Sequence, residues 1–154
     1  MLRVLGRLAV ACLLAGAIAC TLVDRAINSK TGVYATLEEA RAAGAIDRGW
    51  VPQGLPAGTS DMRVAYVDDG VQWGVFAFPP AQGDALRALL GEEVAGNTVH
   101  CTAPGRFEWW PHVLRDPIDL NTAHSTGLRL YASRDSRRTF AVNWNQGRAF
   151  YWRE

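Results

Sequence analysis

The sequence has few cysteines, almost no surplus charge and no hydrophobic run long enough to cross a bilayer. Its 154 residues include 16 basic and 15 acidic side chains and only three cysteines. Proteins that bind nucleic acids usually present a strongly basic face, so this charge balance argues against a nucleic-acid partner. The uncharged run LAVACLLAGAIA, at 8–19, is shorter than the roughly 20 apolar residues that a spanning helix needs. The sequence therefore predicts neither a nucleic-acid-binding protein nor a permanent transmembrane helix.

Motifs for catalysis and for metal or phosphate binding are also missing. The sequence has no Gly-rich phosphate loop and no Gly-x-Ser-x-Gly nucleophile elbow. The candidate metal ligands are the three histidines with a cysteine and two aspartates near them: His100, Cys101, His112, Asp116, Asp119 and His124. Their positions lack the close paired spacing of structural zinc sites, and no two histidines stand four residues apart. We therefore expect no catalytic residue, no bound metal and no cofactor.

The amino terminus has the pattern of an export signal. Arg3 and Arg7 precede the uncharged run, whose length matches the apolar core of a secretory signal. The segment Ala17-Ile18-Ala19 satisfies the small-x-small cleavage rule, which places the cut before Cys20. The segment 17–20 also resembles the lipobox of bacterial lipoproteins, although Ala17 stands where leucine is usual. We expect residues 1–19 to be a lipoprotein-type signal peptide.

The lipobox resemblance implies that Cys20 is the lipidated residue and that the membrane is a partner through the lipid anchor. Stable anchoring takes more than one acyl chain, which the acyl groups of a lipoprotein supply. Thr21 replaces the aspartate that retains enteric lipoproteins in the inner membrane. The implied location is the bacterial cell envelope, at the periplasmic face of the outer membrane if the organism has two membranes. The alternative is a secreted protein in which Cys20 forms a disulfide with Cys101.

The chain after the signal has the length of one compact domain. Without residues 1–19, which include two arginines, 14 basic side chains face 15 acidic ones. Residues 20–33 are mostly polar and show no periodicity, so we expect a tether there. Residues 34–154 are expected to form a single globular domain.

Two short helices are predicted in this domain. Thr36 and Glu39 have the spacing of a capping box before a helix at 37–43, and Gly44 can end it in the left-handed conformation. In GDALRALLG, at 83–91, the leucines recur at helical spacing.

The remaining pattern predicts strands separated by turns and one long irregular stretch at 92–126. The expected strands lie at 62–67, 71–78, 128–132, 139–144 and 148–153. Asp-Gly between the first two strands is a strong hairpin signal, and the basic segment SRDSRR at 133–138 is expected to be a solvated turn. The predicted fold class is α+β, an antiparallel sheet of about five strands with two short helices on one face.

Three segments resemble bacterial proteins with a YbbD head domain: YATLEEARAAGAIDRGWVP, EWWP and FAVNWNQGRAFYW. The resemblance extends over most of the chain from Tyr34 to Trp152, and its most specific part is AGAIDRGWVP. It implies an uncharacterised exported protein, in many relatives a small lipoprotein, and supplies no catalytic residues.

The candidate functional residues are few. A thiol becomes a nucleophile beside a base, so Cys101 with a distant histidine, His112 or His124, is the pattern of a secreted hydrolase or transferase. Adjacent indoles at Trp109 and Trp110 before Pro111 could stack on a sugar or a partner, which makes a carbohydrate-binding module another alternative. Our expectation is a non-catalytic binding or structural protein of the envelope, with an envelope protein or glycan as partner. Its candidate contact residues are Trp109, Trp110 and His112.

Overall fold

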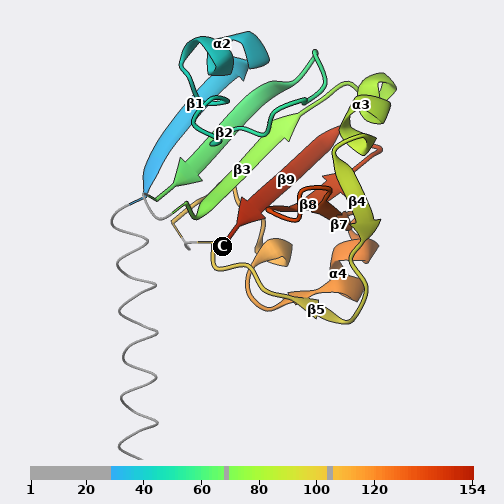
Figure 1. Ribbon diagram of the computed structural model, residues 1–154. Helices are drawn as coiled ribbons and strands as arrows, with labels where there is room; N and C mark the ends of the chain where they lie inside the picture. Colours follow the sequence, from blue (N-terminus) through green and yellow to red (C-terminus); the bar gives the residue numbers. More distant parts are fainter. Residues whose placement is uncertain (1–28, 68–69, 104–105) are drawn as a thin grey trace, which may run out of the picture.

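The computed structural model describes residues 29–67, 70–103 and 106–154. The expected signal peptide, Cys20 and the tether as far as residue 28 lie outside the described residues, as do Asp68 and Asp69 of the predicted hairpin turn. Figure 1 shows one large twisted sheet with short helices packed against it. None of the helices in the described ranges has the length and hydrophobicity needed to cross a bilayer.

Seven antiparallel strands form the main sheet, in the order β1-β2-β3-β9-β8-β7-β4. The strands are β1 (Lys30–Thr36), β2 (Ser60–Tyr66), β3 (Gln72–Ala77), β4 (Leu90–Glu93), β7 (Arg129–Ser133), β8 (Thr139–Asn143) and β9 (Arg148–Arg153). The α+β class is confirmed, but about five strands was too low a prediction. Both additional strands, β1 and β4, lie at the edges of the sheet. Each buries a single residue, so neither shows the alternation that identifies a strand in a sequence.

The predicted hairpins are present. Strand β2 pairs with β3, and β8 pairs with β9 through a turn in which Gly147 has φ +61. The domain begins earlier than Tyr34, because residues 30–33 at the end of the expected tether pair with β2. Backbone hydrogen bonds to a neighbouring strand hold this polar stretch in the sheet although its side chains are mostly exposed.

Both predicted helices are present, and the first one agrees with its predicted capping signals. Helix α2 (Leu37–Ala42) begins at Thr36, whose hydroxyl accepts a hydrogen bond from the Glu39 N–H at 3.2 Å, and Gly44 has φ +70. Helix α3 (Gly83–Arg87) follows the 3-10 helix η1 (Pro80–Gln82) and is shorter than the leucine spacing predicts. The reason is that Leu90 turns into β4, where it pairs with Ser133.

The stretch 92–126 contains regular structure that the sequence did not predict. It holds β5 (Thr98–Val99), the 3-10 helix η2 (His112–Leu114), β6 (Ile118–Asp119) and helix α4 (Leu120–Ser125). The two short strands pair with each other in a second sheet. The Asp119 carboxylate caps α4 by accepting a hydrogen bond from the Thr122 N–H at 2.7 Å, within the stretch predicted to be irregular.

The sheet is covered on both faces. Leu37 and Ala40 of α2 and Leu86 of α3 pack on one face, as predicted. Leu120 and Ala123 of α4 pack on the opposite face together with the segment that follows Cys101. Among the described residues, the buried side chains of both cores come from Tyr34 to Trp152.

Candidate functional site

A row of polar side chains crosses four adjacent strands at one end of the sheet. Lys30 of β1 is opposite Tyr66 of β2, which is opposite Gln72 of β3, which is opposite Arg153 of β9. Directly opposite residues of paired strands point to the same face, so these four side chains line up on the α2–α3 face. In the neighbouring row, Val64, Gly74, Tyr151 and Phe140 continue the hydrophobic core. The polar row therefore marks the point where the core ends on this face.

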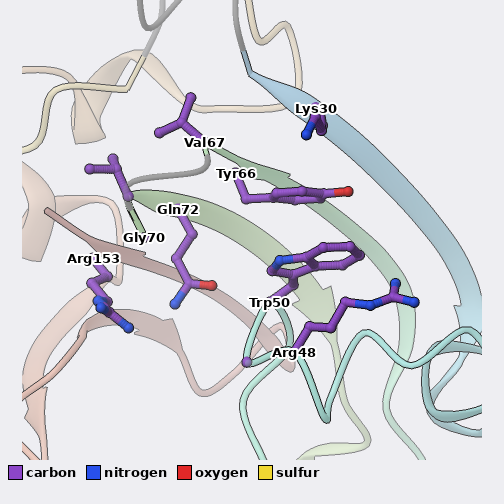
Figure 2. A pocket seen from close by; sticks show the side chains of 10 residues that line it. Lys30, Arg48, Trp50, Tyr66, Val67, Gly70, Gln72 and Arg153 are labelled. Carbon is purple, nitrogen blue, oxygen red and sulfur yellow. The ribbon is translucent and has the colours of Figure 1, made fainter.

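The loop after α2 brings Trp50 and Arg48 over this row. Gly49, with φ +73, lets the chain reverse, and the Trp50 N–H donates to the carbonyl of Ala45 at 2.9 Å. The indole of Trp50 stacks on the Tyr66 ring, with ring centroids 3.8 Å apart and planes 14° from parallel. The Arg48 guanidinium lies over the indole at 4.7 Å from its centroid. Figure 2 shows Arg48, Trp50 and Tyr66 stacked in this order.

Buried donors hold this loop in place. The Gln72 side chain is only 3% exposed, and its amide donates to the carbonyls of Gly49 (2.8 Å) and Trp50 (3.1 Å) in the orientation that satisfies all its neighbours. In that orientation its oxygen accepts from Nε and Nη2 of Arg138, at 2.9 and 3.1 Å. Arg138 also donates to the Gly49 carbonyl at 2.7 Å, and the Tyr151 hydroxyl donates to the Trp50 carbonyl at 2.6 Å.

This network leaves a positive charge close to the site. Within the described part of the chain, the Arg138 guanidinium donates its hydrogen bonds to neutral oxygens, those of Gly49 and Gln72. Burial lowers the pKa of Arg138 from its ordinary value, and burial likewise raises the pKa of the Tyr151 hydroxyl. The hydroxyl therefore stays protonated and remains a donor, while an arginine stays charged at neutral pH because its ordinary pKa is so high.

Together these groups enclose a cleft of about 280 Å³. It is lined by Lys30, Arg48, Gly49, Trp50, Tyr66, Val67, Gly70, Val71, Gln72 and Arg153. Gly70 has φ +90, and a Cβ added there would come 2.9 Å from Nη2 of Arg153, so glycine lets this arginine lie across the turn. Within the described ranges, the lining includes three basic side chains and no carboxylate. Such a cleft is suited to an anionic ligand.

A larger cleft of about 550 Å³ lies beyond Gly49 on the same face. Its wall mixes apolar side chains, such as Val51 and Leu89, with the turn between β7 and β8. In that turn Asp135 accepts hydrogen bonds from the Ser133 hydroxyl at 2.6 Å and the Arg137 N–H at 3.1 Å. The carboxylate is therefore engaged in shaping the turn, and the mixed charge does not indicate one class of ligand.

The structure does not assemble a catalytic thiol. Cys101 is 1% exposed, and burial raises its pKa to about 12. His112 is exposed on η2, and Nε2 of His124 lies 3.6 Å from the Glu93 carboxylate. Neither histidine forms a hydrogen bond with the Cys101 thiol within the described residues. A thiol with such a pKa is protonated at neutral pH and is not a nucleophile.

His100 and Asp116 are a pair of potential acid–base groups at hydrogen-bond distance from each other. The Nδ1 of His100 lies 2.7 Å from the Asp116 carboxylate, and both side chains are exposed. Asp116 also accepts a hydrogen bond from the Cys101 N–H at 3.3 Å. No hydroxyl or thiol of the described residues forms a hydrogen bond with the other ring nitrogen of His100, so the pair has no nucleophile to activate there. The described residues likewise contain no group of three or more potential metal ligands.

The paired tryptophans serve the core. Trp110 is 1% exposed, its Nε1 donates to the carbonyl of Leu114 at 2.8 Å, and its ring packs edge-on against Phe150 and Trp152. Trp109 is half-buried and stacks on Phe107 with centroids 5.1 Å apart. The pair covers the face of the sheet opposite the cationic cleft.

Sequence reasoning missed the residues of the cationic cleft for identifiable reasons. The predicted hairpin at 62–78 includes Tyr66 and Gln72, which pair across its two strands. Neither residue by itself indicates a ligand-binding site. Arg138 belongs to the basic segment predicted to be a solvated turn, yet the fold partly buries its guanidinium against a loop 89 residues earlier. Only the register of β9 against β3 adds Arg153 to the site.

Comparison with known proteins agrees with the predicted resemblance over part of the chain. Residues 29–77 match the family model of the YbbD head domain. The match includes Arg48, Trp50 and Tyr66 of the cleft, and the segments EWWP and FAVNWNQGRAFYW lie beyond it. No curated protein and no solved structure gives a significant match to the chain. The segment that supplies β1, α2, β2 and β3 thus matches the YbbD head domain, and this match covers about a third of the chain.

Proposed function

We propose that this protein is a lipid-anchored component of the bacterial cell envelope that binds an anionic envelope ligand without reacting with it. The observation that carries the proposal is the cationic cleft, whose walls are held by a buried network before any ligand arrives. A rigid site binds at a lower entropic cost than one that must be ordered by its ligand. The lipobox-like segment that ends at Cys20 supports the anchor and the location.

The anchor places the domain at a membrane, at the periplasmic face of the outer membrane in an organism with two membranes. The rival function, a hydrolase or transferase that uses Cys101, is disfavoured because the thiol is buried and its pKa is raised to about 12. A glycan site at Trp109 and Trp110 is disfavoured because Trp110 is buried and its Nε1 already donates to the Leu114 carbonyl.

The anchor is tested by labelling cells with radioactive palmitate. The wild-type protein should incorporate label and sediment with membranes, whereas Cys20→Ser should lose both properties. Recovery of an unmodified wild-type thiol in the culture fluid would contradict the proposed anchor.

The binding role is tested by a photocrosslinking amino acid at Tyr66 in intact cells. We expect one dominant crosslinked species that disappears when Arg48 and Arg153 are both replaced by glutamine. The same pair of changes at the exposed Arg41 and Arg129 should leave the crosslink intact. A crosslink that does not depend on the cleft arginines would contradict an anionic ligand at this site.

A further inference from the structure

The cationic cleft lies at the end of the sheet from which the chain runs back toward Cys20. Lys30 is the first residue of β1 and one of the lining residues. Figure 1 shows the start of β1 at the same end of the sheet as the end of β9, where Arg153 lies. The segment that would join a lipid anchor to the domain therefore emerges beside the cleft.

The length of this segment limits how far the cleft can lie from an anchor. Ten residue steps separate Cys20 from Lys30. Fully extended, they span about 35 Å, and as a flexible chain they span about 17 Å on average. If Cys20 carries lipid, the cleft stays within a few nanometres of the lipid headgroups at all times.

The chemistry of the cleft fits a phosphate group. Guanidinium groups bind phosphate oxygens through paired N–H donors, and Arg48 and Arg153 come from separate elements on two sides of the cleft. The partly buried charge of Arg138 lies behind Gln72 and adds to the positive potential. Stacked Trp50 and Tyr66 are side chains of the kind that concentrates where a protein meets the headgroup region of a membrane.

We infer that the cleft binds the phosphate of anionic phospholipid headgroups around the anchor, so that this end of the sheet docks on the membrane. The inference rests on the proposed function, because the anchor brings the cleft to the headgroups. A tethered site of this kind gains from a high local concentration of its ligand, so a weak individual contact is sufficient.

The test uses residues 20–154 with Cys20→Ser, which is unlipidated and contains both hydrophobic cores. Co-sedimentation is measured with vesicles of phosphatidylglycerol mixed with phosphatidylcholine and with vesicles of phosphatidylcholine alone. Binding should occur only to the anionic vesicles, and it should weaken as salt rises from 0.1 to 1 M because the screening length shortens from about 10 to about 3 Å. Each basic residue near such a surface contributes roughly fivefold, so Arg48→Gln with Arg153→Gln should weaken binding roughly 25-fold.

The control variant, Arg41→Gln with Arg129→Gln, removes the same charge from exposed positions outside the cationic cleft. It should bind at least several-fold more tightly than the cleft variant. Equal loss in both variants would mean that only net charge matters, and binding to both vesicle types alike would exclude headgroup recognition. Either result overturns the inference, provided that thermal unfolding shows both variants to be folded.

Titration with glycerol phosphate and with inorganic phosphate separates a lipid from a soluble source. Saturable binding of inorganic phosphate with no binding to anionic vesicles would assign the cleft to a soluble ligand and overturn membrane docking. Because the tested chain is unlipidated, failure here leaves palmitate labelling at Cys20 unaffected. Membrane docking through the cleft and lipid anchoring at Cys20 can therefore be disproved independently of each other.

Discussion

At the scale of single residues, Gln72 and Arg138 decide the position of the loop that carries Trp50. Their donors satisfy carbonyls that would otherwise be buried without partners, and such groups are costly to leave unpaired. Gln72 is thus a structural amide on a strand that is otherwise apolar on this face. Because this loop forms one wall of the cleft, its hydrogen bonds contribute both to the stability of the protein and to the shape of the binding site.

Replacing Arg138 tests this role. Arg138→Ala removes the donors to Gly49 and Gln72, and we expect the free energy of unfolding to fall by about 2 kcal/mol. The neighbouring Arg137 is exposed, so Arg137→Ala should change it by less than about 0.5 kcal/mol. Urea denaturation of the two variants provides the measurement. Equal, small effects would show that the network contributes little.

Cys101 gives a second prediction at this scale. Because its pKa is raised to about 12 from an ordinary 9.0, the folded protein holds the thiol proton over pH values at which the unfolded chain releases it. The stability that this group contributes is therefore complete below about pH 9 and is lost as pH rises toward 12. Cys101→Ala should flatten this part of the stability profile.

The same burial controls reactivity. Maleimide should label wild-type Cys101 slowly at pH 7.5 and rapidly in urea. Rapid labelling of the folded protein at pH 7.5 would contradict the inert role of this thiol.

At the scale of elements, the pairing of β3 with β9 depends on a glycine. Gly74 is opposite Tyr151, and a Cβ at this position would lie 2.2 Å from the Tyr151 ring. The ring thus occupies the space above the glycine, and from there its hydroxyl reaches the Trp50 carbonyl.

Gly74→Ala should therefore force the Tyr151 ring to move. Both residues are buried, so we expect a loss of about 1–3 kcal/mol in the free energy of unfolding, together with a weaker hold on the Trp50 loop. Gly83→Ala is the matched control, because a Cβ there meets Trp144 at an ordinary 3.5 Å. Thermal unfolding would show the difference, and equal melting temperatures would count against this packing.

The elements also show what the sequence can and cannot predict. The five strands found from the sequence carry alternating or buried apolar residues, and the capped helix α2 follows from Thr36, Glu39 and Gly44. The edge strands β1 and β4 were missed because backbone pairing alone places them. Helix α4 is stabilised by Asp119 and by burial of Leu120 and Ala123 on the sheet, which only the tertiary fold provides.

The candidate site could not be predicted from the sequence for a related physical reason. Its residues lie up to 123 positions apart in the sequence, from Lys30 to Arg153, and they meet through strand register. The sequence instead predicted functional roles for residues such as Cys101 and Trp110, which the fold buries in the core.

At the scale of the whole molecule, the YbbD head match covers only one side of the sheet. Residues 29–77 end at the last residue of β3, and every residue of β3 before Ala77 is buried. The partner that covers the other edge of β3 is β9, at 148–153. A fragment with residues 29–77 alone should therefore show no cooperative thermal transition by circular dichroism, whereas residues 29–154 should. A cooperative transition in the fragment would mean that the matched segment is an independent domain.

The central position of β9 has a consequence for how the protein reaches its final form. During synthesis, β2 and β3 are complete some seventy residues before β9 has been made. One edge of β3 therefore remains unpaired during this time. Closing such a distant pair is slow in comparison with forming local hairpins. The proposed export would require an unfolded chain to cross a membrane, and this delay favours it, because the sheet cannot be completed before its last strand has been made.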